Sequence, residues 1–217
     1  MTTARKKSRK ELASAVLWNT AWLSLIVFGF ALIEKFETTS GPALARQKTA
    51  VSPSPYWPST SKIAFKGPTL LMFVHPQCPC SKTSVAELRT ILPKLKEINT
   101  CIVVFSPPDE NWDSAQLLEP LRGEAQIVVY RDESGKAASD FGATTSGEFL
   151  FYGANKKLLF AGGITRARGQ EGNSAYLDVL QAAIGGSEKH LCQTPVYGCA
   201  LADNPAPLSE VVESWTR

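Results

Sequence analysis

The sequence lacks a strong excess of charge of either sign. Its 217 residues contain 23 Lys and Arg and 20 Asp and Glu, so the formal net charge is only +3. Five of the positive charges lie within the first ten residues, and the rest of the chain has a net charge of −2. A domain with this balance has no basic field that attracts phosphate backbones. The composition therefore argues against a nucleic-acid-binding protein.

The sequence is also poor in signals for nucleotide binding and for several membrane spans. Its glycine-rich segment, residues 162–172, contains neither G-x-x-x-x-G-K-[ST] nor G-x-G-x-x-G, so no phosphate-binding motif supports the use of a nucleotide. Hydrophobic residues make up 44% of the chain, too much for a disordered protein and too little for a protein with many spans. The length fits one buried domain with attachments.

One stretch is long and apolar enough to cross a membrane. Leu12–Ile33 contains no charged side chain. At about 1.5 Å per residue it covers roughly 33 Å, close to a hydrocarbon core of about 30 Å. By the positive-inside rule, the basic residues 1–11 place the N-terminus in the cytoplasm and the chain from about residue 35 onward outside. The alternative is a cleaved secretory signal, for which Ala43–Ala45 has the small-x-small pattern.

The outer part of the chain begins with a linker and continues with alternating strand and helix patterns. Residues 34–62 are rich in Pro and Ser and predict an extended spacer. The predicted strands are 69–74, 101–105, 126–130, 148–152 and 157–161, and the predicted helices are 81–99, 114–121, 137–141 and 174–184. This order predicts an α/β domain with parallel strands and a hairpin near its end. The tail, residues 187–217, is predicted to be mostly irregular.

Two cysteines follow the first predicted strand, at the start of the first long helix. The string His75–Ser81 places Cys78 and Cys80 at the carboxyl end of a buried strand. Unpaired N–H groups and the helix dipole at such a turn stabilise a thiolate, which is the attacking species in disulfide exchange. We therefore expect Cys78 to be an ionised nucleophile open to solvent, and Cys80 to resolve mixed disulfides. The enzyme assignment depends on the Cys78 sulfur being open to solvent and lying at the opening turn of the long helix.

The order of elements over residues 63–186 resembles the thioredoxin fold, which carries its active cysteines at this turn. Thioredoxins have Cys-Gly-Pro-Cys there, whereas this chain has Ser81 at the second cysteine position and Cys80 one residue earlier. A disulfide between Cys78 and Cys80 would close a small, strained ring across Pro79, so we expect it to be easily reduced and a good oxidant or isomerase. Pro79 is expected to contact the substrate.

The same resemblance implies other residues that contact a partner. The loop Thr145, Ser146 and Gly147 lies near the place where thioredoxins have a cis-Pro before the fourth strand, and is expected to bind the partner chain. The loop after the last strand borders the active cysteines in this fold. Arg166 and Arg168 in that loop are therefore candidates for stabilising the thiolate or binding an anionic group.

Several motifs together resemble a group of bacterial membrane-bound thioredoxin-like proteins often labelled RedB. They are the N-terminal span, the Cys78–Ser81 string, the Thr145–Gly147 loop, the Gly162–Arg168 segment and the Cys-containing tail. The resemblance implies redox work at a membrane surface. We therefore expect a single-pass protein of the bacterial inner (cytoplasmic) membrane whose periplasmic domain is a thiol–disulfide oxidoreductase. Its partners would be protein thiols or disulfides and an unidentified electron donor, without a cofactor.

The three remaining cysteines have different interpretations. Cys101 lies inside a predicted buried strand and needs no role beyond packing. Cys192 and Cys199 lie in the tail, and outside the cytoplasm the expected outcome is a structural disulfide between them. A second hypothesis is that the tail folds back, so that Cys192 or Cys199 relays electrons to Cys78.

Three other functions remain open from the residues alone. His75, Cys78 and Cys80 offer the soft thiolates and imidazole that suit Cu(I), so copper binding or delivery is one alternative. A peroxiredoxin-like thiol peroxidase is another, although His75 stands where peroxiredoxins place a Thr three residues before the reactive Cys. The third is a binding module that uses the fold as a scaffold.

Overall fold

The structure is a computed structural model that describes residues 9–40, 53–107, 113–172, 174–186 and 190–201. The chain divides into two units, Met1–Thr39 and Ser40–Arg217, which are described separately. The expected cleavage pattern Ala43–Ala45, most of the basic N-terminus and the end of the tail lie outside the described residues.

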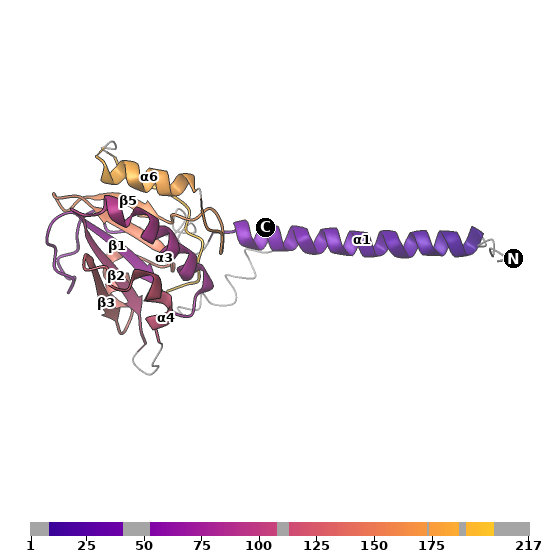
Figure 1. Cartoon of the computed structure of the whole chain (residues 1–217), viewed down its shortest axis with the longest axis horizontal. Helices are drawn as coiled ribbons and strands as arrows, with labels where there is room; N and C mark the ends of the chain where they lie inside the picture. Colours follow the sequence, from indigo (N-terminus) through magenta and orange to yellow (C-terminus); the bar gives the residue numbers. More distant parts are fainter. Residues whose placement is uncertain (1–8, 41–52, 108–112, 173, 187–189, 202–217) are drawn as a thin grey trace. The chain divides into compact units, whose positions relative to one another are not determined.

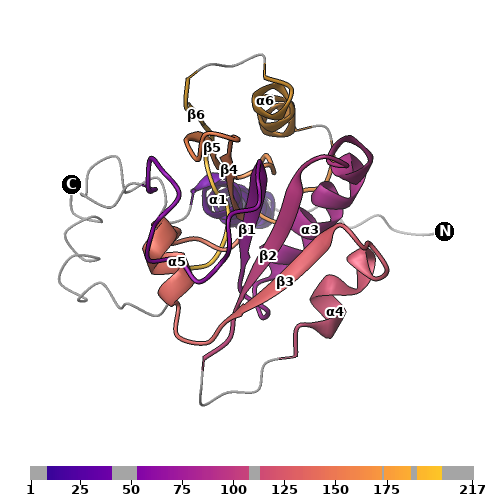
Figure 2. The same ribbon diagram turned by 90° about the vertical axis from the view of Figure 1, so that its left-hand side faces the viewer.

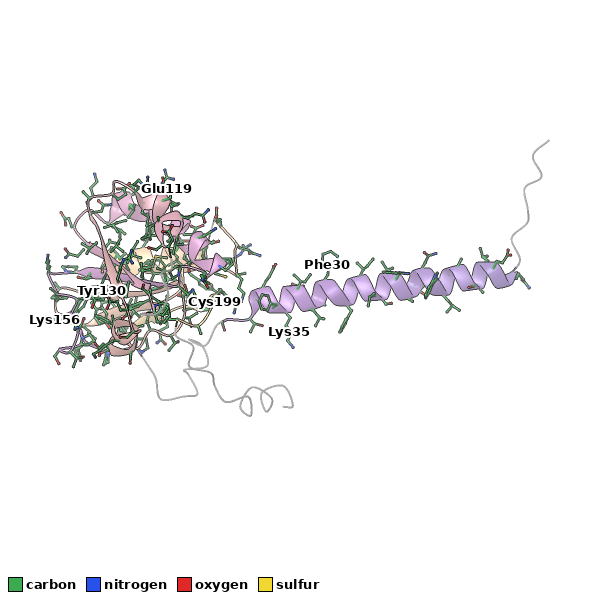
Figure 3. All side chains as sticks on the ribbon, turned by 90° about the horizontal axis from the view of Figure 1, so that it is seen from below. Phe30, Lys35, Glu119, Tyr130, Lys156 and Cys199 are labelled. Atoms are coloured by element: carbon green, nitrogen blue, oxygen red, sulfur yellow. The ribbon has the colours of Figure 1, made fainter. Side chains whose placement is uncertain are left out.

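The first unit contains one long helix, α1 (Arg9–Thr38). An 18-residue window within its segment Glu11–Thr38 has a mean hydropathy of 1.9 and contains no buried residue, so its length and composition allow it to cross a membrane. Figure 3 shows the side chains of Phe30 and Lys35 projecting from this helix. The polar side chain of Asn19 donates to the carbonyl of Ala15 at 2.8 Å, as suits apolar surroundings. The prediction of one long apolar N-terminal helix is confirmed.

The second unit is built on a six-stranded mixed sheet in the order β3-β2-β1-β4-β5-β6. β1 lies parallel to β2, and β2 parallel to β3, while β4 is antiparallel to both β1 and β5. Figure 2 shows β1, β2 and β3 side by side. The sequence-based strands agree with those observed to within two residues at each end, which confirms the predicted α/β order. The strands are β1 (Thr69–Val74), β2 (Asn99–Phe105), β3 (Ile127–Asp132), β4 (Glu148–Tyr152), β5 (Leu158–Gly162) and β6 (Cys192–Gln193).

Helices cover both faces of this sheet (Figure 1 and Figure 2). On one face lie α3 (Pro79–Ile91), α4 (Ala115–Leu118) and α6 (Ala175–Ile184), and on the other lies α5 (Lys136–Phe141). The long helix is shorter than predicted: it ends at Ile91, where a 3-10 turn (Leu92–Lys94) takes over, because Pro93 has no N–H to continue the helix. A second 3-10 turn, Glu119–Leu121, follows α4.

Strand β1 lies at the centre of the core and is buried on both faces. Leu70, Met72 and Val74 pack into the cluster under α3 and α6, while Leu71 and Phe73 pack into the cluster under α5. The alternation follows from the two-residue period of a strand. Burial on both sides explains why the strand is a continuous apolar run and why its carboxyl end is held rigidly.

The folded domain begins earlier than the predicted boundary at residue 63. The Trp57 ring packs edge-on against Phe141 and Tyr152, with ring centroids 4.9 and 5.3 Å away. The Tyr152 hydroxyl donates to the Ser54 carbonyl at 2.9 Å. The second half of the predicted linker is therefore part of the domain, because a large aromatic side chain finds an apolar seat there.

Residues 190–201 are mostly irregular, as predicted, but they are packed onto the domain and contribute a short strand. β6 pairs with β5 in parallel, and Ala200 forms an antiparallel bridge with Thr145. Val196, Tyr197 and Leu201 are buried. This segment, which we call the docked tail (residues 190–201), is an integral part of the fold.

Candidate active site

The two cysteines lie at the opening turn of α3, as predicted. Cys78 is the N-cap residue, in an extended conformation with φ −84° and ψ 117°, and Pro79 follows at the first helical position. The N–H of Cys78 donates to the His75 carbonyl at 3.0 Å, and the N–H of Ser81 donates to the Cys78 carbonyl at 3.0 Å. A proline suits this position because its missing N–H would have no helical partner.

A closed ring of three hydrogen bonds fixes this turn against the loop before β4. The His75 N–H donates to Ser146 Oγ at 2.8 Å, and Ser81 Oγ donates to the His75 carbonyl at 3.1 Å. The hydroxyls of Ser81 and Ser146 are 2.5 Å apart. Because the Ser81 proton is already used, Ser146 donates in this last bond. The serine at the second cysteine position thus has a structural role that the sequence did not reveal.

The environment of Cys78 favours its thiolate. A hydrogen bond from the Cys80 thiol is the largest influence that lowers the pKa of Cys78, to about 4. Burial opposes this lowering, and hydrogen bonds from Cys199 and from the backbone of Ser81 reinforce it. The pKa of Cys80 is raised, first by its hydrogen bond to Cys78 and then by burial. The pair therefore holds one negative charge, on Cys78.

The prediction that the Cys78 sulfur is open to solvent is wrong. Cys78 is 1% exposed and Cys80 is 8% exposed. The backbone N–H of Cys199, in the docked tail, donates to Cys78 Sγ at 3.4 Å. Cys199 as a whole residue is exposed, but part of it is buried against its neighbours. This partial burial is the largest cause that raises the pKa of Cys199, to about 11, and the hydrogen bond and charge of Cys78 act in the same direction. Part of the cover over the nucleophile is thus a segment near the end of the chain.

The loop Thr145, Ser146 and Gly147 contacts the same tail segment. Gly147 adopts φ +86°, which favours glycine, and its N–H donates to the Phe73 carbonyl at 2.8 Å. The N–H of Ser146 donates to the Cys199 carbonyl at 2.8 Å. The loop therefore presents a strand edge beside the cysteines, and the tail is paired with it.

The structure separates the two candidate arginines. Arg166 is exposed. Arg168 donates from Nη1 to the Gly198 carbonyl at 3.0 Å, and its charge acts to lower the pKa of both Cys80 and Cys199 against the raising influences there. Arg168 is therefore the arginine that the fold brings to the site.

The alternative metal set is not assembled. The Nδ1 atom of His75 accepts a hydrogen bond from the Gln77 N–H at 3.1 Å, and its ring stacks on Phe105 with centroids 5.8 Å apart. Within the described ranges, no group of three or more His, Cys, Asp or Glu side chains could hold a metal ion. The arrangement of His75, Cys78 and Cys80 therefore gives no support to a copper site.

The remaining cysteines differ from one another. Cys101 is buried in β2 and its pKa is raised to about 12 by burial, in agreement with the predicted packing role. The structure contains no disulfide between Cys192 and Cys199, so the predicted pairing of these two cysteines stays a prediction. Cys192 pairs with Phe160 in the sheet, whereas Cys199 is directed to Cys78. The two thiols thus have different neighbours.

The sequence analysis raised the docked tail only as a second hypothesis, in which Cys192 or Cys199 reaches Cys78, and the structure places Cys199 there. The tail's one available signal is glycine placement. A Cβ atom at Gly198 would lie 1.9 Å from the Ser146 carbonyl oxygen, and one at Gly163 would lie 2.6 Å from that of Pro195. Gly198 in the docked tail and Gly163 in the body of the domain each permit a close approach between the tail and the rest of the domain.

No family model and no curated protein matches the chain. Among solved structures, an uncharacterized conserved protein from Geobacillus kaustophilus is 16% identical, with a TM-score of 0.52, covering 72% of this chain and 91% of its own. A hypothetical protein from Sinorhizobium meliloti is 18% identical, with a TM-score of 0.51, covering 62% and 79%. A secreted Mycobacterium tuberculosis disulfide oxidoreductase homologous to E. coli DsbE is 13% identical, with a TM-score of 0.41, covering 55% and 81%.

The fold is thioredoxin-like. At such low identities the similarity concerns the fold alone, and function has to be argued from the residues of the site.

Proposed function

We propose that this protein is a thiol–disulfide oxidoreductase of the bacterial inner membrane, related to the RedB-type proteins. In this proposal α1 anchors it, with the N-terminus in the cytoplasm and the thioredoxin-like domain in the periplasm. The observation that carries the proposal is the place of Cys78 as the N-cap residue of α3, with Cys80 in the first turn of the same helix and surroundings that lower the pKa of Cys78.

The pKa of Cys78 bears on the direction of exchange. A low pKa stabilises the reduced form and makes the thiolate a good leaving group. Both effects favour transfer of a disulfide from the protein to client thiols. Strain in a ring closed by Cys78, Pro79 and Cys80 acts in the same direction.

The reaction proceeds through two successive thiol–disulfide exchanges, in which atoms and electrons balance. A client thiolate attacks the Cys78 sulfur of the Cys78–Cys80 disulfide, and Cys80 leaves and takes up a proton. A second client thiolate then attacks the client sulfur of the mixed disulfide, and Cys78 leaves as a thiolate. The client loses two electrons and gains a disulfide, while a disulfide of a redox partner restores Cys78–Cys80 by the same chemistry in reverse.

Client binding is assigned to the edge at Thr145–Gly147. A strand edge binds an extended peptide through main-chain hydrogen bonds, which suits a catalyst that accepts many sequences. The fit of the docked tail on this edge supports the assignment.

The experiment uses the full chain in detergent, oxidised beforehand, with a reduced peptide dithiol as client. Cys78→Ser should lower the rate of peptide oxidation to that of the peptide alone, because no sulfur remains to accept the attack. Cys192→Ser, a change in the other tail cysteine, should behave as the wild type. Equal rates for Cys78→Ser and the wild type would refute the function.

A further inference from the structure

The client-binding edge is already paired with a strand of the same chain. The N–H of Ser146 donates to the Cys199 carbonyl at 2.8 Å, and the N–H of Leu201 donates to the Thr144 carbonyl at 2.9 Å. Between these bonds Thr145 and Ala200 form the antiparallel bridge. Such a ladder is the pattern by which an extended peptide adds to a sheet edge.

The binding position beside the Thr145–Gly147 edge fits residues 198–201 in particular. A Cβ atom at Gly198 would overlap the Ser146 carbonyl oxygen, so only glycine permits the observed approach. Arg168 Nη1 donates to the Gly198 carbonyl at 3.0 Å, directly before the cysteine. Buried Val196 and Tyr197 hold the chain upstream of this point. The segment is therefore positioned from both sides of Cys199.

The cysteine in this segment reaches the nucleophile. The backbone N–H of Cys199 donates to Cys78 Sγ at 3.4 Å, and the Cys199 side chain is among the groups that lower the pKa of Cys78. Cys80 makes the corresponding thiol contact from within the same turn. Cys78 thus has two thiol neighbours, one in its own helix and one 121 positions further along the chain.

We infer that residues 198–201 are an internal occupant of the client-binding edge, and that Cys199 is an internal substrate of the Cys78–Cys80 disulfide. The inference rests on the proposed oxidoreductase function. Exchange converts Cys78–Cys80 into Cys78–Cys199, which closes the site covalently. Cys80 reopens it by the reverse attack.

This rearrangement needs no outside oxidant. Cys199 loses its proton and its thiolate attacks the Cys78 sulfur. The Cys78–Cys80 bond breaks as the Cys78–Cys199 bond forms, and Cys80 leaves as a thiolate that takes up a proton. One disulfide and one thiol are present before and after, so the electron count is unchanged.

The charges around Cys199 set the order of events. In the reduced protein the burial of Cys199 and the charge on Cys78 hold the pKa of Cys199 at about 11, so Cys199 remains a thiol. When Cys78 enters a disulfide its negative charge disappears. Arg168, whose charge lowers the pKa of Cys199, then acts without that opposition. The pKa of Cys199 is therefore lower in the oxidised than in the reduced protein, although burial still raises it.

Disulfide mapping of the full chain in detergent tests the inference. The reduced protein is treated with oxidised glutathione, quenched with acid and digested for mass spectrometry. The wild type and Cys192→Ser should contain Cys78–Cys199, whereas Cys199→Ser should contain Cys78–Cys80. Cys199→Ser should also oxidise a peptide dithiol faster than the wild type, because its site cannot close covalently.

Each outcome bears on a separate claim. A wild type that contains Cys78–Cys80 alone, together with a Cys199→Ser variant that oxidises the peptide at the wild-type rate, would overturn the inference and leave the oxidoreductase function standing. If no variant with an intact Cys78 forms a disulfide at that residue, the oxidoreductase function falls as well.

A steric variant tests the seat without removing a cysteine. Gly198→Val should displace the segment, so that alkylation of Cys78 in the reduced protein accelerates by more than about tenfold as two main-chain hydrogen bonds are lost. Gly29→Val is the matched control, because a Cβ at Gly29 meets nothing within 4 Å. Alkylation of Gly198→Val at the wild-type rate would show that the segment does not control access.

Discussion

The turn at His75–Ser81 and the docked tail both place a cysteine at one site, but they are held in different ways. The turn lies between a fully buried strand and a helix, two hydrogen bonds join it to Ser146, and a third closes it from Ser81 to the His75 carbonyl. The docked tail is held at Cys199 through main-chain hydrogen bonds to a loop edge, with an exposed side chain. The comparison teaches that the Cys78 sulfur is fixed by the core of the domain, while Cys199 is positioned mainly by main-chain pairing with a loop edge.

The largest expected effect is on the titration of the turn. The pKa of Cys78 is lowered from its ordinary value to about 4, so the folded, reduced protein binds fewer protons than the unfolded chain between that pH and about 9. The stabilisation from this group is complete above the unfolded pKa and is lost as the pH falls toward 4. Unfolding in denaturant at a series of pH values should therefore show stability rising with pH across this window.

The matching variant is Cys78→Ser, in which that dependence should disappear. The ultraviolet absorbance of the thiolate in the reduced wild type, measured as the pH is lowered, gives an independent value for the pKa of Cys78. If the Cys78 sulfur titrates near its ordinary pKa, the hydrogen-bond donors of Cys80 and Cys199 do not stabilise its negative charge. The predicted difference in pKa between Cys78 in the turn and Cys199 in the tail is then contradicted.

A smaller effect is expected where the turn is locked to the loop. Ser146→Ala leaves the His75 N–H without its acceptor and removes the partner of Ser81, so we expect a loss of about 1–3 kcal/mol in the free energy of unfolding. Urea titration measures it. Ser134→Ala, at an exposed position, is the control and should change stability little. Equal stabilities of the two variants would contradict the account of a rigid turn.

The smallest effect is expected at the arginine that binds the tail. Arg168→Gln weakens the hydrogen bond to the Gly198 carbonyl, which is expected to contribute about 0.5–1.5 kcal/mol. Its loss should raise the population in which the tail is displaced from Cys78 several-fold. Alkylation of Cys78 should accelerate accordingly, while Arg166→Gln, a change at an exposed arginine, should leave it unchanged. If both arginine variants react alike, Arg168 does not position the tail.

Much of the scaffold could be predicted because its signals are local. The continuous apolar run at Thr69–Val74 and the alternation that follows predict the strands and their order, and the cysteines after that run predict the position of the turn. The helix predicted over residues 81–99 ends at Ile91 instead, because a kink and a helix end at Pro93 have the same local signal. The boundary at residue 63 failed because the seat of Trp57 is made by residues far along the chain.

The candidate site could be predicted only in part. The positions of Cys78 and Cys80 follow from one strand and one helix start, but the ring through Ser81 and Ser146 joins residues 65 positions apart. The choice between Arg166 and Arg168 depends on where the Gly198 carbonyl lies. Side-chain roles that depend on such contacts leave no local pattern.

By itself, the sequence determined an apolar N-terminal helix, an α/β domain and a cysteine pair at a helix start, because hydrophobic period and helix ends depend on near neighbours. Only the tertiary structure decided that Cys78 is buried, that the tail is paired with the loop at Thr145, and that Cys199 rather than Cys192 meets the nucleophile. The physical reason is that main-chain pairing at a sheet edge makes few demands on side chains. No local pattern in the sequence therefore shows which segment occupies that edge.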